Sequence, residues 1–130
     1  AAVANTSSSY IDTGLSCSIT PTATSSKVLV LANQSWGKNN TNTQIDAQLE
    51  RAISGGSTTA PYTEWLNDNV YTGDSSYLYT APSSLVFLDT PSTTSEITYT
   101  TQFRNAAGTG IVTANTNNTF ARMVLMEVLA

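Results

Sequence analysis

The stretch ITYTTQFR, residues 97–104, decides the fold class because its side chains alternate in character. Starting at Ile97, every second side chain is apolar or a threonine, and the side chains between them are polar up to Arg104. Successive side chains of a strand point to opposite sides of a sheet, so a period of two predicts a strand with one buried and one wet face.

Further strands are expected on both sides of this stretch. Alternation favours strands at 15–20 and 45–53, and apolar segments favour a short strand at 111–114 and a long one at 120–129. The segments 45–53 and 120–129 could also form helices. The uninterrupted apolar runs at 27–31 and 84–89 predict strands that are buried on both faces.

The remaining segments predict loops, and the whole pattern predicts one architecture. Residues 33–43 are polar around Trp36 and are expected to form a loop, and 57–82 is the least periodic part. Seven or eight short strands at spacings of about 8 to 12 residues predict an all-β fold, an antiparallel β-sandwich that is jelly-roll-like. We expect a single β-sandwich domain at 10–130, preceded by a flexible N-terminal arm at 1–9 whose small and polar residues could order on assembly.

The composition limits the classes of partner. Only 11% of the 130 residues are charged, compared with about 25% in an average protein, and 22 Thr, 16 Ser and 11 Asn replace them. Five basic and nine acidic residues give a net charge of −4 without any basic cluster, so nucleic-acid binding is not expected. No run approaches the roughly 20 apolar residues of a membrane span, so no membrane partner is expected.

Few catalytic mechanisms are open to this chain. It contains no histidine, which excludes histidine bases and histidine metal ligands. Asp12-Thr13-Gly14 matches the active-site triplet of aspartic proteases, but Leu15 follows where that family has a small residue, and we favour a tight connection between two strands. We therefore predict that the protein is not an enzyme.

No cofactor and no metal site are predicted either. The acids that could bind calcium through loop oxygens lack the spacing of a calcium loop; they are Asp12, Asp74 and Asp89. The lone Cys17 cannot form an internal disulfide, and its place in an alternating run predicts a small buried hydrophobic residue.

Four phrases occur in a recognisable order: SSYIDTGLSCSITP (8–21), SSKVLVL (25–31), FLDTPSTTSEITYTTQFR (87–104) and MVLMEVLA (123–130). Together they resemble a module that recurs in structural proteins of tailed bacteriophages, especially phages of cyanobacteria and marine bacteria. The resemblance covers both ends of the chain, and little of 33–82 matches.

This resemblance implies a virion structural protein with a jelly-roll-like fold, commonly assembled as a homotrimer. It favours a capsid decoration (cement) protein that sits on the outer surface of the particle and binds the major capsid protein. The alternative is a tail-fibre receptor-binding module that recognises host surface glycans. In either case we expect aromatic anchors to contact the partner, and the candidates are Trp36, Tyr62, Trp65 and Tyr71.

Overall fold

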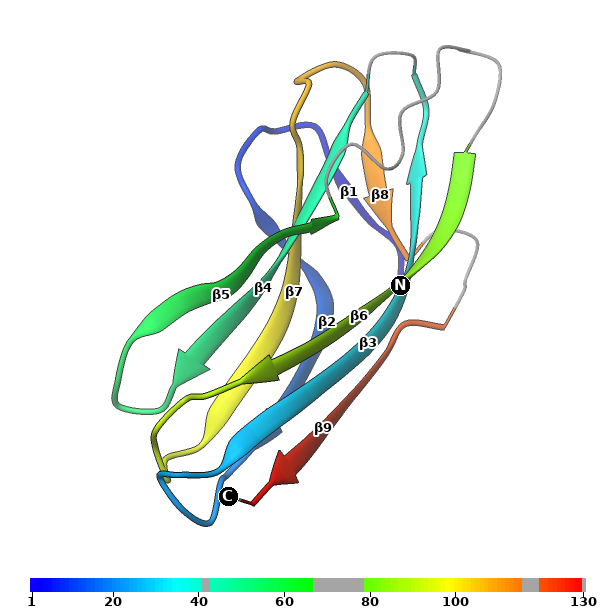
Figure 1. The fold of residues 1–130 in the computed structure, drawn as a ribbon. Helices are drawn as coiled ribbons and strands as arrows, with labels where there is room; N and C mark the ends of the chain where they lie inside the picture. Colours follow the sequence, from blue (N-terminus) through cyan, green and yellow to red (C-terminus); the bar gives the residue numbers. More distant parts are fainter. Residues whose placement is uncertain (41–42, 67–78, 116–119, 130) are drawn as a thin grey trace.

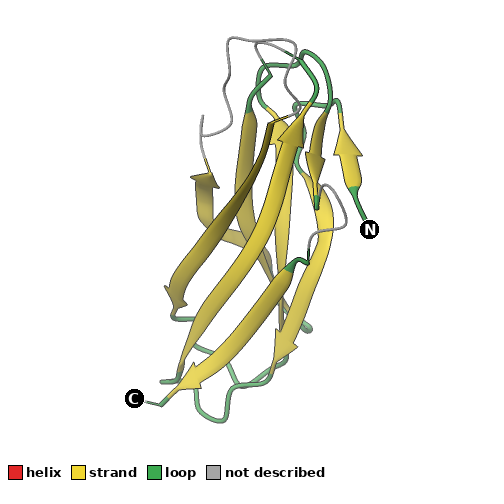
Figure 2. Cartoon of the chain, turned by 90° about the vertical axis from the view of Figure 1, so that its right-hand side faces the viewer, coloured by secondary structure: helices red, strands yellow, loops and turns green. Residues whose placement is uncertain are grey.

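The computed structural model describes residues 1–40, 43–66, 79–115 and 120–129. They form nine strands: β1 (Val3–Asn5), β2 (Ile11–Ile19), β3 (Lys27–Lys38), β4 (Ile45–Ile53), β5 (Thr58–Leu66), β6 (Tyr79–Asp89), β7 (Ile97–Asn105), β8 (Val112–Ala114) and β9 (Arg122–Val128). Only strands and loops occur in this described part (Figure 2), so none of its elements is a helix that could cross a membrane.

The strands form two antiparallel sheets that pack face to face, which confirms the predicted all-β sandwich. One sheet has the order β1-β8-β3-β6, with β9 also paired to β3, and the other has the order β2-β7-β4-β5. Between β1 and β8, the β4–β5 connection joins two strands of the same sheet. Each of the other connections in this range crosses from one sheet to the other. This is the strand order of a jelly roll, in which two Greek keys wrap around one core.

The long strand β3 organises its sheet. It pairs with β6 along almost its whole length on one side, from Val28 opposite Asp89 to Lys38 opposite Tyr79. On its other side, β9 pairs with residues 27–33 and β8 pairs with residues 36–38. β8 and β9 therefore take the place of one jelly-roll strand, and β9 runs beside the lower half of β3 (Figure 1).

The core has two apolar halves. One centres on Trp36, Ile45 and Phe103, and the other on Leu49 and Tyr99. These residues come from β3, β4 and β7, so both sheets supply the core. The inward residues of β7 are those that the alternation at 97–104 predicted, and that prediction is confirmed.

A chain of buried hydrogen bonds also lies in the interior. The Thr13 and Thr101 hydroxyl oxygens are 2.6 Å apart, and the Thr101 hydroxyl donates to Oε1 of Gln34 at 2.9 Å. The Gln34 amide donates to Oδ1 of Asn115 at 2.9 Å, and the Asn115 amide donates to the Thr13 carbonyl at 3.0 Å. We call these four residues the interior polar chain; it satisfies side chains that would be costly to bury alone.

Two sequence-based boundaries are wrong. The loop expected at 33–43 is instead strand as far as Lys38, because Gln34 belongs to the interior polar chain and its inward position therefore looks polar in the sequence. The aperiodic 57–82 segment contains β5 and the start of β6. Two register shifts between β4 and β5, and a positive φ of 53° at Glu64, remove the simple alternation from β5.

Two N-terminal segments, 1–9 and 12–14, also have a structure other than the one expected from the sequence. Within the 1–9 segment, expected to form an arm, β1 pairs with β8 from Val3 opposite Ala114 to Asn5 opposite Val112. Asp12-Thr13-Gly14 does not connect two strands but lies inside β2, at a shift in its register with β7. Gly14 has a φ of 81°, which a glycine adopts without steric cost, so the triplet forms an irregularity in a continuous strand.

Candidate functional site

The outer side of the sheet formed by β6, β3 and β9 carries an exposed apolar surface. The strand register aligns its side chains in two rows of three, Val86-Leu31-Val124 and Leu88-Leu29-Met126, with Val128 beyond the second row. We call these seven residues the apolar face. Their arrangement follows from antiparallel pairing, which places directly opposite side chains within contact distance.

Much of this face is open to solvent. The exposed fractions of its side chains reach 68% at Val86, 48% at Leu88, 52% at Val124 and 51% at Met126. Single exposed apolar residues are common on proteins, but a contiguous patch over three strands is typical of an interaction site. The prediction that 84–89 is buried on both faces is therefore wrong for Val86 and Leu88 within one chain.

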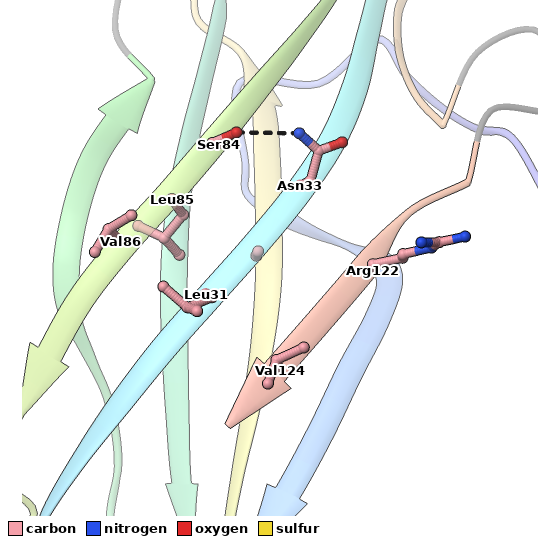
Figure 3. A pocket seen from close by; sticks show the side chains of 8 residues that line it. Leu31, Asn33, Ser84, Leu85, Val86, Arg122 and Val124 are labelled. Carbon is pink, nitrogen blue, oxygen red and sulfur yellow. Dashed lines mark hydrogen bonds between the residues drawn. The ribbon is translucent and has the colours of Figure 1, made fainter. Parts of the chain in front are cut away.

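A shallow hollow of about 270 Å³ marks the upper end of the apolar face. In Figure 3 its labelled side chains come from all three strands, and the Asn33 amide donates to the Ser84 hydroxyl at 3.0 Å above the first apolar row. The residues that line the hollow include Leu31, Asn33, Ser84, Val86, Arg122 and Val124. The hollow thus has an apolar floor and a polar upper border.

The outer side of the opposite sheet has the contrary character. We call its central residues the polar face: Asp12, Asp46, Gln48, Glu50, Gln102 and Arg104. The Gln102 amide nitrogen donates to Asp12 at 2.8 Å and to Glu50 at 3.0 Å, while Gln48 donates to the Gln102 oxygen at 2.7 Å. Arg104 forms an ion pair with Asp46 at 2.8 Å. Each of these groups already has a partner within the chain.

The three predicted aromatic anchors that the structure describes are not part of the apolar face. Trp36 is completely buried, with its ring 5.7 Å from that of Trp65 and 5.9 Å from that of Phe103. Trp65 is half-buried between the two halves of the core. Tyr62 is 36% exposed and stacks on Phe87 at 5.1 Å, and Tyr71 lies outside the described residues.

The residues of the apolar face were missed as site residues, although the sequence carries a signal for them. Consecutive apolar residues occupy both faces of a strand, as in LVFL at 85–88 and MVLM at 123–126. Such runs indicate that something covers each face. Their position at the outside of a two-layer sandwich means that none of the described strands supplies the second cover.

The candidate catalytic groups are dispersed. Asp12 is exposed on the polar face, and Thr13 points inward to the interior polar chain. Cys17 is half-buried, so it is less enclosed than predicted. Over the described ranges, no three cysteine or acidic side chains lie close enough to hold a metal ion.

Asp89 is a buried acid whose ion pair joins the two sheets. Its carboxylate pairs with Arg51 at 2.9 Å and accepts a hydrogen bond from the Tyr99 hydroxyl at 2.6 Å. Burial, followed by this hydrogen bond and the negative charge of Asp89, raises the pKa of Tyr99 above its usual range. All three side chains are occupied with one another, so we interpret the group as a tie between β6, β4 and β7.

Comparisons with known proteins give a distant likeness only. No family model matches the sequence, and no curated protein sequence matches it. One solved structure that the chain resembles is the crystal structure of the infectious bursal disease virus VP2 subviral particle, at 12% identity and a TM-score of 0.45. The match covers 95% of this chain and 33% of the VP2 chain, so this chain spans about a third of that protein's length. A likeness at this level assigns neither a function nor a partner.

Proposed function

We propose that this chain is a structural protein of a virus particle and works as the capsid decoration (cement) protein of a tailed phage. In this proposal the apolar face packs against the major capsid protein on the outer surface of the head. The proposal assigns the chain no enzymatic activity and no cofactor. The observation that carries it is the apolar face itself, a three-strand surface that no part of the described chain covers.

The apolar face offers a substantial binding free energy. Burying a Val, Leu or Met side chain completely contributes about 1.5 to 3 kcal/mol, so each half-exposed side chain retains about 1 kcal/mol for a partner. The four most exposed side chains of the face would then contribute roughly 4 kcal/mol together. Because the face belongs to a paired sheet, it is preorganised and little ordering entropy opposes docking.

The phrases that resemble phage structural modules supply most of this surface. SSKVLVL contains Leu29 and Leu31, FLDT contains Leu88, and MVLMEVLA contains Val124 and Met126. The resemblance depends on the order of the phrases, whereas the apolar face is defined by solvent exposure, so the two are independent. Their coincidence on β3, β6 and β9 supports an assembly role.

The receptor-binding alternative has less support. Sugar-binding surfaces rely on exposed aromatic rings, which offer an apolar body with a polar rim. Of the predicted anchors within the described ranges, Trp36 is buried and Tyr62 already stacks on Phe87. The apolar face consists of Val, Leu and Met side chains without an aromatic ring, and this favours a protein partner over a glycan.

The test is binding to phage capsids that lack the protein. Purified protein should sediment with such capsids and raise their resistance to heat or chaotrope. Val86→Asp should weaken binding about thirtyfold or more, because it removes apolar burial and places a charge in a dry contact. If wild-type protein neither binds capsids nor protects them, the decoration role is excluded.

Two controls give this test its specificity. Ile111→Asp changes an exposed apolar side chain away from the apolar face, and it should bind capsids like the wild type. Binding to whole host cells separates the alternative, because a receptor-binding module should bind cells and a decoration protein should not. Sedimentation equilibrium then tests whether the protein is the homotrimer that the resemblance implies.

A further inference from the structure

The charged side chains that point outward beside the apolar face have one sign, whereas Glu127 of β9 is opposite the buried Val28 and accepts hydrogen bonds from Thr22. The positions considered are the outward residues of β3, of β9 and of the part of β6 that begins at residue 82. Two of them are charged, Lys27 and Arg122. Arg122 lies at one end, in the row with Asn33, and Lys27 lies at the other, opposite Val128. Both residues are exposed, so the apolar face is bordered by a cation at each end.

These two cations differ from the other basic side chains. Arg51 is paired with Asp89, and Arg104 is paired with Asp46 and lies 3.6 Å from Glu64. Lys38 is almost completely buried. Within the described ranges, neither Lys27 nor Arg122 forms an ion pair, although the chain as a whole carries a net charge of −4.

The arrangement disfavours a second copy of this chain stacked on the apolar face. If the two-fold axis ran along the strands, Lys27 would approach its own equivalent, and so would Arg122. If the axis ran across the strands, each Lys27 would approach an Arg122 equivalent. Both arrangements bring like charges together at each end of a contact that should be dry, which is unfavourable.

We infer that the occupant of the apolar face is a protein surface with a flat apolar strip and carboxylates at both ends of the strip. This inference rests on the proposed function and specifies the chemistry of the partner. Six residues separate the Arg122 and Lys27 rows along the strands, so the two groups of carboxylates should lie roughly 20 Å apart. The apolar strip supplies burial, and the carboxylates fix orientation and speed association.

A bead assay with defined chemistry tests the inference without a biological partner. The beads carry hexyl chains together with carboxylates, and binding is measured at 50 and 500 mM NaCl. Lys27→Gln/Arg122→Gln should bind about fivefold more weakly than the wild type at 50 mM NaCl, and the difference should vanish at 500 mM because salt screens the charges.

Two matched variants separate local charge from net charge. Ser16→Glu/Ser18→Glu changes the net charge by the same −2 on the outer side of the opposite sheet, and it should lose less than half as much affinity as the glutamine variant. Lys27→Arg/Arg122→Lys keeps both charges and should bind like the wild type. Equal losses for the glutamine and glutamate variants would overturn the inference, and circular dichroism verifies that each variant is folded.

Capsids distinguish failure of this inference from failure of the proposed function. Capsid binding that Val86→Asp abolishes but Lys27→Gln/Arg122→Gln leaves unchanged would retain the decoration role and overturn the carboxylate-bordered partner. Capsid binding that both variants weaken supports both proposals. If the wild type ignores capsids while the bead results hold, the decoration role falls and the partner chemistry stands.

Discussion

The two outer faces of this sandwich show how the same backbone pattern can serve opposite purposes. On the polar face, Gln102 and its neighbours form hydrogen bonds and ion pairs with one another, so the surface is complete without a partner. On the apolar face, Val86 and its neighbours have no polar groups to satisfy and remain open to solvent. An outer face that is internally satisfied suits water, whereas one that is apolar and uncovered suits assembly.

The largest loss of stability should come from breaking the Asp89 ion pair, which joins the two sheets that carry the two faces. Asp89→Ala leaves Arg51 partly buried without its counter-ion and removes the acceptor of the Tyr99 hydroxyl. We expect unfolding free energy to fall by about 3 kcal/mol, as when one partner of a buried pair is removed. Urea denaturation measures this, and a loss below about 1 kcal/mol would show that the faces do not depend on this tie.

A second test uses alkaline pH at the same tie. The pKa of Tyr99 is raised in the folded protein, whereas the unfolded side chain loses its proton near pH 10. The stabilisation is therefore complete below pH 10 and is lost as the pH rises above it, at about 1.4 kcal/mol per pH unit. Tyr99→Phe should remove this contribution, and denaturation of both proteins between pH 9 and 11 isolates it from the other tyrosines. Parallel stability curves would refute the assignment.

A third test compares two opposite substitutions, one that places an apolar side chain on the polar face and one that places a polar side chain on the apolar face. Gln102→Leu breaks three hydrogen bonds on the polar face and should cost about 1 kcal/mol of unfolding free energy. Leu31→Gln places an amide among apolar neighbours on an open surface and should cost less than this, while weakening capsid binding. Thermal denaturation compares the pair; a larger loss at Leu31 would mean that the apolar face serves folding more than docking.

The smallest expected effect is on stability after partial removal of the apolar face. Val124→Thr/Met126→Thr keeps the strand propensity of β9 and replaces exposed apolar groups, so the melting temperature should change little, corresponding to less than about 0.5 kcal/mol. The binding of a hydrophobic dye should decrease in the same variant. Unchanged dye binding would place the accessible apolar surface elsewhere.

The sequence was most informative where burial alternates with exposure. The strand at 97–104 was predicted to within one residue of the observed β7, because its inward side chains are almost all apolar and its outward side chains are polar. The extension of β3 through Trp36 was hidden because Gln34 is inward and polar, and local hydropathy cannot reveal a partner that is distant in the sequence, such as Thr101. The pairing of β3 with both β8 and β9 likewise depends on contacts between distant segments.

The candidate site illustrates a different limit. The apolar runs at 85–88 and 123–126 show that both faces of these strands avoid water, but they do not show which face the domain itself covers. Only the stacking order of the sheets reveals that Val86 and Val124 point away from the core. The aromatic anchors were chosen by residue type, and residue type alone does not separate a core tryptophan such as Trp36 from a contact residue.

The interior polar chain has a consequence for how the sheets find their alignment. Its members come from β2, β7, β3 and the residue after β8, so it closes only when both layers have reached their native pairing. A shift of β7 by one residue would turn Thr101 toward solvent. The amide oxygen of Gln34 would then lose its hydrogen-bond donor. Apolar contacts alone would tolerate several shifted strand registers. These few amide and hydroxyl groups destabilise every register except the native one.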